Sequence, residues 1–221
     1  MGVHRVIDGD TLVLADGRHV RFIGIDAMEL GHDGSADQPY AAAARDRLKQ
    51  LIEDHGGKLR LETDSEAYDE HGRMLAYLFA GGEDLGLTLI REGLAVVVAV
   101  PPDLAQLGCY AEAEARARAS HLGIWSKDSP LVTAAADAPL GAGTFLIVHG
   151  RITRASHTRA GDHLLLDGHL PLWIPAADLS WFGSDPAGWQ GRQGLVRGWL
   201  RVYRGTPELD VHAPAALLAW P

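Results

Sequence analysis

Three clusters of charged side chains near the start of the chain combine residue types that suit phosphate chemistry. Aspartate oxygens bind hard cations such as Ca²⁺, and the planar fork of arginine matches the oxygens of a phosphate. A separate glutamate can orient or deprotonate a water molecule. Hydrolysis of a phosphodiester needs such a water, together with groups that neutralise the anion and its transition state. The clusters are Asp8-Gly9-Asp10-Thr11, Arg21 with Asp26 and Glu29, and Asp69-Glu70-His71-Gly72-Arg73.

Each cluster taken alone has a simpler explanation. An Asp-Gly-Asp sequence is most often a turn, and a single arginine in a strand usually faces solvent. The chemical hypothesis therefore depends on the order of the clusters along the chain and on the elements that carry them.

Turn signals and periodicity predict those elements. Residues 3–14 and 18–25 are predicted strands, and Asp16-Gly17 is the hairpin signal between them. Apolar residues at helical or alternating spacing predict the remaining elements. These are strands at 59–63, 75–79 and 94–100, and helices at 38–54, 85–92 and 103–121.

Three local features refine the helices. Ser35-x-x-Gln38 is the expected capping box of the first helix. The alternating Ala, Glu and Arg residues of 111–118 predict a solvated helix face. Cys109 is the single cysteine, which excludes an internal disulfide and a cysteine zinc cage, and we expect it to be a small buried side chain.

A change of composition divides the chain. Residues 127–142 are rich in Ala, Ser, Pro, Asp and Gly and predict a linker between a first domain, 1–126, and a second, 143–221. The second region has short helical turns predicted at 176–182 and 185–190. Its five short strands indicate a small β-rich domain that is compatible with a partly open, OB-like barrel. The strands are predicted at 144–154, 162–167, 171–174, 195–203 and 208–212.

Composition limits the classes of protein. The 221 residues carry a net charge of −9 with 47% hydrophobic residues, which is typical of a globular protein with no membrane span. Such a charge predicts modest affinity for nucleic acid and no long basic groove. The chain opens on a strand pattern with no signal peptide. Its location, secreted, periplasmic or cytoplasmic, and its oligomeric state are left open.

Five ordered segments across residues 3–126 resemble the staphylococcal-nuclease (thermonuclease) family. They cover somewhat over half of the chain, and five ordered matches are a specific signal. The segments are Val6-Ile7-Asp8-Gly9-Asp10-Thr11, Val20-Arg21-Phe22-Ile23-Gly24-Ile25-Asp26-Ala27-x-Glu29, Gly72-Arg73-x-Leu75-Ala76-Tyr77, Leu89-Ile90-Arg91-Glu92-Gly93-Leu94-Ala95 and Leu122-Gly123-Ile124-Trp125.

The resemblance implies a fold and an activity. The family has a five-stranded OB barrel with three helices, so the chain is expected to be mainly β with helices. The family cleaves DNA and RNA with little sequence preference and leaves 3′-phosphate ends. A Ca²⁺ cofactor and a DNA or RNA substrate are therefore expected.

The resemblance also assigns a metal site. Asp10 and Asp26 match the calcium ligands, and Ala27 keeps the main-chain carbonyl that a threonine usually supplies at this position. Asp8 matches a family position close to the metal. It is expected to orient a metal ligand rather than to bind the ion itself.

Catalytic roles follow in the same way. Arg21 and Arg73 match the arginines that bind the phosphate and stabilise the transition state. Glu29 matches the general base, or the carboxylate that orients the water. Asp69 is expected to order the loop that carries Arg73.

Two departures from the family pattern affect the expected activity. Met28 stands where the family usually has proline, which predicts a looser loop around Glu29. Glu70 and His71 replace a lysine and a tyrosine that hold a nucleotide phosphate in the best-known member. Glu70 is expected to weaken substrate binding, while His71 is either a substitute donor or a solvated loop residue.

The second region offers a separate set of residues for nucleic-acid contact. Arg197, Trp199 and Arg201 alternate along one predicted strand and could share a face. Tryptophan can stack on unpaired bases in OB folds, although core packing is the simpler role for most of the tryptophans in this region. They are Trp173, Trp181, Trp189, Trp199 and Trp220.

Three hypotheses remain at this stage. The first is an active metal-dependent nuclease, favoured by the complete set of acidic and arginine residues. The second is a catalytically weak or inactive nuclease-like module that binds nucleic acid or acts as an adaptor, favoured by Met28, Glu70 and the net charge of −9. The third is a structural or envelope-associated protein whose tryptophan-rich second region docks a partner.

Overall fold

The computed structural model describes residues 1–31, 34–141, 145–182 and 186–218. The chain divides into two compact units, Met1–Ser129 and Pro130–Pro221. The predicted boundary between residues 142 and 143 lies outside the described residues, as does Trp220. Within the described residues, no helix is long and apolar enough to cross a membrane.

Unit 1 is built on a sheet with the strand order β1-β2-β3-β6-β5. Only the pairing of β3 with β6 is parallel among these neighbours. An antiparallel bridge between Gly2 and Lys58 joins the start of β1 to the chain just before β5, so the pairings return to the first strand. The bounds are β1 Val3–Val6, β2 Thr11–Leu14, β3 His19–Phe22, β5 Arg60–Glu62 and β6 Met74–Ala80.

Two smaller ladders complete the strands of unit 1. β7 (Glu83–Asp84) pairs with the end of β6, and β4 (Ile25–Ala27) pairs antiparallel with β8 (Ala95–Val97). The β4–β8 ladder carries Asp26, one of the predicted metal ligands. The hairpin signal at Asp16-Gly17 is confirmed, since Gly17 has a positive φ and the backbone N–H of Leu14 donates to the Arg18 carbonyl across the turn.

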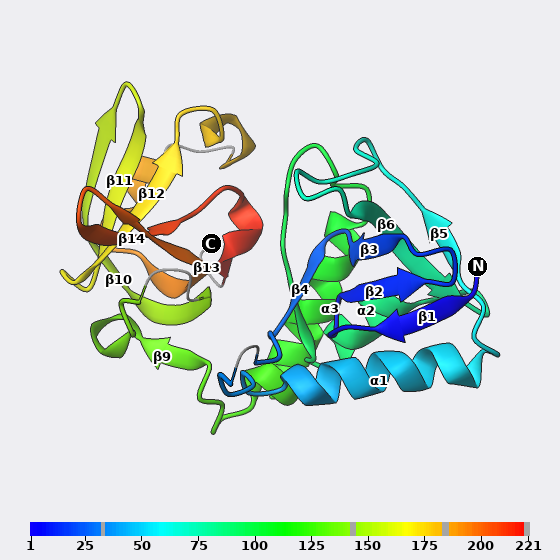
Figure 1. The fold of residues 1–221 in the computed structure, drawn as a ribbon. Coiled ribbons are helices and arrows are strands. Elements are labelled where there is room, and N and C mark those ends of the chain that lie inside the picture. Colours follow the sequence, from blue (N-terminus) through cyan, green and yellow to red (C-terminus); the bar gives the residue numbers. More distant parts are fainter. Residues whose placement is uncertain (32–33, 142–144, 183–185, 219–221) are drawn as a thin grey trace. The chain divides into compact units, whose positions relative to one another are not determined.

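The three helices of the described unit 1 are α1 (Ala41–Asp54), α2 (Leu85–Arg91) and α3 (Leu107–Ala119), shown in Figure 1. The predicted spacing of α1 is confirmed, because Ala41, Ala44, Leu48, Leu51 and Ile52 form its buried face. The predicted capping box is wrong: α1 begins after Tyr40, which has a left-handed backbone and makes no side-chain cap hydrogen bond.

Two expectations for α3 are also corrected. Glu114 is buried together with Tyr110, Ala113 and Ala117, so residues 111–118 are not a fully solvated face. Cys109, predicted to be buried, is exposed. Alanine lies on both the buried and the exposed sides of this helix, so the hydrophobic pattern does not show which side faces the core.

The strands of unit 2 form a single sheet, and five of them pair in a closed ring. The order β13-β14-β12-β11-β10 returns to β13 because β10 also pairs with β13. β12 and β14 are the parallel pair within this ring. The five strands are β10 (Phe145–Thr158), β11 (Gly161–Leu166), β12 (Leu170–Pro175), β13 (Gln193–Tyr203) and β14 (Thr206–Asp210).

Additional short elements border the ring. β9 (Val132–Ala134) adds to β10, and β15 (Leu217–Leu218) adds to β13. Because β9 lies inside the segment expected to be a linker, part of that segment belongs to the sheet of unit 2. The 3-10 turns η3 (Leu179–Phe182) and η4 (Pro186–Trp189) occupy the two predicted helical stretches. Other 3-10 turns are η1 (Gly123–Trp125), η2 (Ala135–Asp137) and η5 (Pro214–Ala216).

Candidate active site

The corner between β1 and β2 packs closely against β4 and α1. Asp8, Gly9 and Asp10 are all buried. A Cβ atom added to Gly9 would lie 2.6 Å from the Cβ atoms of both Ala27 on β4 and Ala44 on α1. Only glycine allows this approach, so the Asp-Gly-Asp corner is fixed between β4 and α1.

Asp10 connects the corner to β4. Its Oδ2 accepts a hydrogen bond from the backbone N–H of Ala27 at 2.6 Å, and its Oδ1 accepts one from Thr11 Oγ1 at 2.9 Å. Asp8 Oδ1 in turn accepts from the backbone N–H of Asp10 at 2.9 Å. Asp8 therefore positions Asp10, and Asp10 holds the main chain of Ala27 close to its own carboxylate.

Arg21 joins the carboxylates from the two strand ends. Its Nε lies 3.3 Å from Asp10 Oδ1, and its Nη2 donates to Asp26 Oδ1 at 2.5 Å. Its Nη1 donates to the carbonyl oxygens of Phe22 at 3.1 Å and Ile25 at 2.7 Å. The chain can curl around the guanidinium because Gly24, between these carbonyls, has a φ of 80°. The structure thus brings Asp10, Arg21 and Asp26 together.

The cluster carries more negative than positive charge. Burial raises the pKa of Asp26 to about 7 although Arg21 opposes the rise, and burial together with the charge of Asp10 raises the pKa of Asp8 to about 7. Burial disfavours the charge of Arg21, but Asp10 and Asp26 outweigh this and raise its pKa. One guanidinium therefore faces several carboxylates, and a further cation would be stabilised there.

The donor set suits a hard cation. Carboxylate and main-chain oxygens are the groups that Ca²⁺ prefers, and Ca²⁺ completes its coordination with water. Within the ranges that the structure describes, no three His, Cys, Asp or Glu side chains converge as a ready cage. Asp10 and Asp26 instead share Arg21, so the residues fit an ion that is held by two carboxylates, a carbonyl and water.

Glu29 belongs to the same charge cluster. Its charge contributes to the raised pKa of both Asp8 and Asp26. Its backbone N–H donates to Gln38 Oε1 at 2.8 Å, and the backbone N–H of Gln38 donates to the Glu29 carbonyl at 2.9 Å. Gln38, expected in a helix cap, thus clamps the Glu29 segment. Met28, which stands where the family pattern has proline, is only 2% exposed, and the looser loop expected from it stays a prediction.

Arg73 directly precedes β6, the strand that pairs with the Arg21 strand β3, but it has its own partner. In the parallel β3–β6 ladder, Arg21 is opposite Leu75, two residues after Arg73. Arg73 Nε donates to Asp69 Oδ2 at 2.7 Å, and Asp69 Oδ1 accepts from the backbone N–H groups of His71 and Arg73. Burial opposes ionisation of Asp69, but these bonds outweigh it and lower its pKa. Asp69 orders the loop, and among the residues that the structure describes no hydrogen bond or ion pair joins Arg73 to Asp10 or Asp26.

The two unusual loop residues both face solvent. The side chains of Glu70 and His71 are 87% and 68% exposed, and His71 Nε2 lies 3.7 Å from Glu70 Oε1. His71 therefore sits beside a carboxylate, and Glu70 adds negative charge near Arg73.

Glu114 is a positioning residue that sequence reasoning missed. It is 2% exposed and accepts a hydrogen bond from the backbone N–H of Val97 at 2.7 Å. Val97 is the register partner of Ile25, the neighbour of Asp26 in the β4–β8 ladder. The signal available was its helical spacing from Tyr110 and Ala117, which share the buried face.

Of the three residues predicted for a nucleic-acid face of unit 2, the burial of Arg197 contradicts one, and the other two stay predictions. Arg197 is only 2% exposed, and its Nη2 donates to the Ala215 carbonyl. Arg201 is paired with Glu208 and Asp210, each at 2.6 Å. Trp199 is 43% exposed and packs edge-on against Phe145. The trio offers one exposed ring but no unpaired cation.

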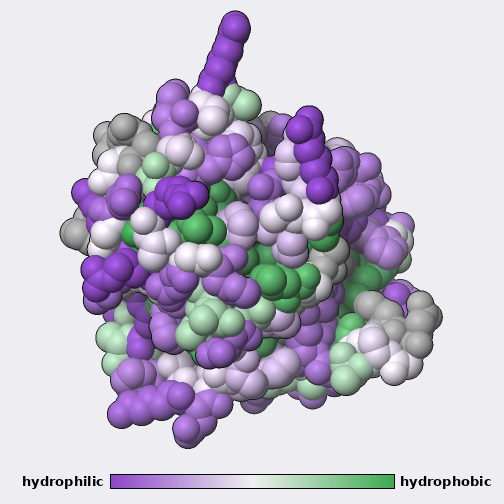
Figure 2. Space-filling model, turned by 90° about the vertical axis from the view of Figure 1, so that its left-hand side faces the viewer, coloured by the Kyte–Doolittle hydropathy of each residue, from purple (hydrophilic) through white to green (hydrophobic). Residues whose placement is uncertain are grey.

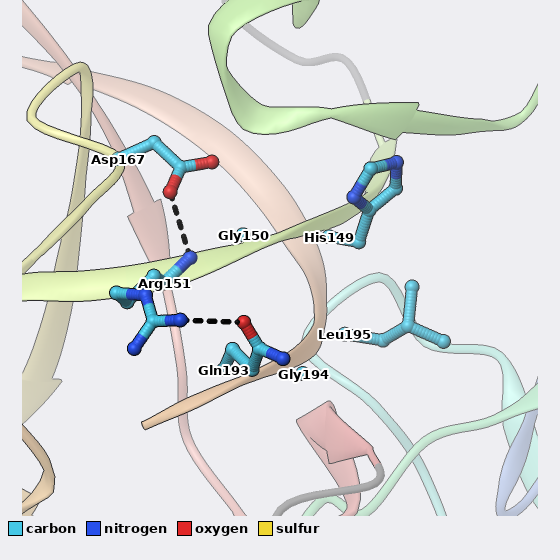
Figure 3. A pocket seen from close by; sticks show the side chains of 7 residues that line it. All are labelled: His149, Gly150, Arg151, Asp167, Gln193, Gly194 and Leu195. Atoms are coloured by element: carbon cyan, nitrogen blue, oxygen red, sulfur yellow. Dashed lines mark hydrogen bonds between the residues drawn. The ribbon is translucent and has the colours of Figure 1, made fainter. Parts of the chain in front are cut away.

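Unit 2 also has an open depression of about 620 Å³ beside the β10–β13 ladder (Figure 3). Arg151 is its main charged group, and Nη1 and Nη2 of its guanidinium donate to the Gly191 carbonyl and Gln193 Oε1. Asp167 accepts from the Arg151 backbone N–H at 2.8 Å. These groups stabilise the strand ends, and the depression lacks the excess of carboxylates that marks unit 1.

Comparison with known proteins agrees with the site in unit 1. The family model described as staphylococcal nuclease homologue matches residues 19–127. "Endonuclease YncB" of Bacillus subtilis is 38% identical over 128 residues, which are 56% of this chain and 60% of that protein. "Thermonuclease" of Staphylococcus intermedius is 37% identical over 128 residues, which are 57% of this chain and 75% of that protein.

A fungal relative matches over a longer stretch. "Probable endonuclease LCL3" of Leptosphaeria maculans is 32% identical over 164 residues, which are 71% of this chain and 52% of that protein. The match with the Bacillus protein likewise leaves a large part of the relative uncovered. The similarity therefore concerns mainly the unit that contains the carboxylate–arginine cluster.

Proposed function

Because the chain belongs to the staphylococcal nuclease family, we propose that it is a Ca²⁺-dependent nuclease that hydrolyses DNA and RNA with little sequence preference. The observation that carries the proposal is the bridge of Arg21 between Asp10 and Asp26, within a buried cluster that has an excess of carboxylates. We also propose that the strand ring of each unit is an OB-type barrel, since both have the same order of pairings.

Asp10, Asp26 and the Ala27 carbonyl would hold the ion. When bound, Ca²⁺ supplies positive charge to the phosphate and lowers the pKa of a water molecule. Asp8 keeps Asp10 in place through the backbone hydrogen bond at the corner. Glu114 keeps β8, and through it the Asp26 strand, in register.

The remaining residues act on the substrate. Glu29, fixed by Gln38, orients the attacking water and accepts its proton. With the carboxylates neutralised by a cation, Arg21 is left to donate to a phosphate oxygen, and Arg73, positioned by Asp69, donates to another. Both guanidiniums then stabilise the negative charge that develops on the phosphate oxygens as water attacks phosphorus. The bond from phosphorus to the 5′-oxygen breaks, that oxygen takes a proton from solvent, and the products would carry 3′-phosphate and 5′-hydroxyl ends.

A cleavage assay tests this function. Single-stranded DNA and RNA are incubated with the protein in Ca²⁺ and in EDTA, alongside Arg73→Ala and Glu29→Gln. We expect degradation only with Ca²⁺, and a loss of about 10²-fold or more in either variant. Product ends should become substrates for 3′ extension only after phosphatase treatment. Cleavage in EDTA, or variants as active as the parent, would contradict the proposal.

A weakly active binding module is the second candidate. Glu70 favours it, because its carboxylate is 87% exposed beside the loop where a phosphate would be held. Retained DNA binding with no cleavage in Ca²⁺ would support this alternative. If Glu70 is the cause, Glu70→Lys should restore cleavage, and Asp128→Lys makes the same charge change at an exposed position outside the cluster.

A further inference from the structure

A second groove in unit 1 has no part in the catalytic cluster. It has a volume of about 520 Å³ and lies between β1 and α1, which run side by side in Figure 1. β1 is the first strand of its sheet and forms one wall of the groove, and α1 forms the opposite wall. The charged and apolar side chains that matter for its chemistry are His4, Arg5, Ile7, Arg45, Lys49 and Glu53.

The groove is cationic on a protein whose net charge is −9. Arg5, Arg45 and Lys49 line it, and Glu53 is the one carboxylate among its lining residues. Asp46 lies beside them, 2.7 Å from Arg45 and 3.8 Å from Lys49. Arg5 is exposed and, within the part of the chain that the structure describes, has no carboxylate partner. The positive charges thus outnumber the negative ones even with Asp46 included.

The placement of the cations suits a polymer of phosphates better than a small anion. They come from both walls of the groove, Arg5 from β1 and Arg45 and Lys49 from α1. Val3 is half-buried and adds some apolar surface, whereas Val6 and Ile52 are buried in the core. A positively charged groove that follows the backbone is a common part of sites for single-stranded nucleic acid. The described lining residues include no Phe, Tyr or Trp ring for stacking on bases, so contacts with phosphates would carry the binding.

One end of the groove adjoins the acidic corner. Ile7 lines the groove, and the next residue is Asp8. On the other wall, Arg45 follows Ala44, whose Cβ packs against Gly9 of the same corner. A strand lying in the groove would therefore reach the corner that positions Asp10.

We propose that this groove, lined by Arg5, Arg45 and Lys49, binds the phosphodiester backbone of a single-stranded nucleic acid outside the scissile bond. This inference rests on the proposed nuclease function for its substrate, but binding is measured separately from cleavage. The groove gives this acidic protein a short cationic surface. A long basic groove is not expected at its net charge.

Binding is measured by fluorescence anisotropy of a labelled single-stranded DNA in EDTA, over a range of NaCl concentrations. The test variant is Arg5→Ala/Arg45→Ala/Lys49→Ala. The control is Arg91→Ala/Arg116→Ala/Lys127→Ala, which removes the same charge from exposed positions outside the groove. We expect about tenfold weaker binding for the test variant, and a salt dependence reduced by about 0.7 per lost phosphate contact. The control should keep the salt dependence of the parent.

Cleavage kinetics then separate the groove from the active site. The loss of kcat/KM in the test variant should appear in KM and grow with substrate length, being largest for a long strand and smallest for a dinucleotide. Equal losses in test and control variants, or no binding by the parent protein, would overturn the groove assignment. A parent that binds in a groove-dependent way but never cleaves would refute the nuclease function and leave the groove standing. Circular dichroism checks folding, and Arg5→Lys should bind nearly as well as the parent.

Discussion

The two units contain the same path of strand pairings but differ in where they place charge. In unit 1 the order β1-β2-β3-β6-β5 returns to the first strand through the Gly2–Lys58 bridge, and in unit 2 the order β10-β11-β12-β14-β13 returns through the β10–β13 ladder. In each ring the third and fifth strands along the chain form the parallel pair. The backbone arrangement therefore does not by itself explain the candidate site.

The difference lies in the third strand of each ring and in the corner that precedes its second strand. β3 carries Arg21 beside the Asp8-Gly9-Asp10 corner, whereas its counterpart β12 buries Leu170, Leu172 and Ile174. Unit 2 also brings two acids to one arginine, since Glu208 and Asp210 both lie 2.6 Å from Arg201, and Asp162 lies 2.6 Å from His157. Unit 1 gathers a larger set, because the charges of Asp8, Asp10, Asp26 and Glu29 all act on Arg21. The size of this carboxylate excess, rather than the fold, distinguishes the candidate site.

Hydrophobic side chains on one face of the molecule do not form a large continuous patch. The face shown in Figure 2 is mostly hydrophilic, with hydrophobic side chains in small separate patches. Exposed Trp181, Trp199 and Tyr203 are among the larger hydrophobic residues of unit 2. Scattered exposed residues of this kind are normal for soluble domains.

The largest expected effect comes from removing the central cation of unit 1. Arg21→Gln should lower kcat by about 10²–10³-fold, because a donor to the transition state is lost. It should also lower stability, since Asp10 and Asp26 lose their buried partner. Arg21→Lys keeps the charge but not the fork, and should remain folded while still cleaving slowly. Steady-state kinetics and thermal unfolding measure both effects.

The matching change in unit 2 should affect stability alone. His157→Ala removes one hydrogen bond of the fully buried Asp162, the 2.6 Å contact with His157 Nδ1, at a cost of about 0.5–1.5 kcal/mol. Cleavage by the folded protein should stay at the parent rate. If His157→Ala reduced kcat as much as Arg21→Gln, the contrast between the units would be lost.

At the corner itself we expect a fall in cleavage smaller than that of Arg21→Gln. Gly9→Ala places a Cβ atom 2.6 Å from Ala27 and Ala44, so we expect overpacking to cost about 1–3 kcal/mol and cleavage to fall. Gly108→Ala is the control, because an added Cβ meets nothing within 4 Å and alanine favours the α3 helix. Denaturant unfolding of both variants measures the difference, and equal stabilities would argue against a tightly wedged corner.

The smallest predicted effect concerns the strand behind Asp26. Glu114→Ala removes the acceptor of the Val97 N–H and should cost about 1–3 kcal/mol with a moderate fall in kcat. Glu114→Gln retains an acceptor and should recover most of both. Glu112→Ala, at a side chain that is 76% exposed, should change stability by less than about 0.5 kcal/mol. A Glu114→Ala variant as stable as Glu112→Ala would remove Glu114 from the support of the site.

Much of the fold could be predicted because its signals are local. The Asp16-Gly17 turn, the α1 periodicity and the five alternating strands of unit 2 all correspond to observed elements. Signals that depend on tertiary contacts failed. Gln38 bonds to Glu29 across the loop instead of capping α1, and Arg197 is buried against Ala215 although its strand position is compatible with solvent.

The site was predictable in its residue types but not in its bonding. Order and spacing placed Asp10, Arg21, Asp26 and Glu29 in one set. No local pattern could indicate that Arg21 would bridge both aspartates, because this depends on the bend at Gly24 and the packing of Gly9. Glu114 was also missed. Alanine lies on both the buried and the exposed sides of α3, so the hydrophobic pattern alone does not show which side faces the core.

The most direct measurement is a crystal structure of the protein with Ca²⁺ and a nucleoside 3′,5′-bisphosphate. We predict an ion bound by Asp10, Asp26 and the Ala27 carbonyl, with a phosphate between Arg21 and Arg73 and a water molecule facing Glu29. An ion bound elsewhere, while Asp10 and Asp26 remain paired only with Arg21, would contradict the assignment of this cluster as the catalytic site.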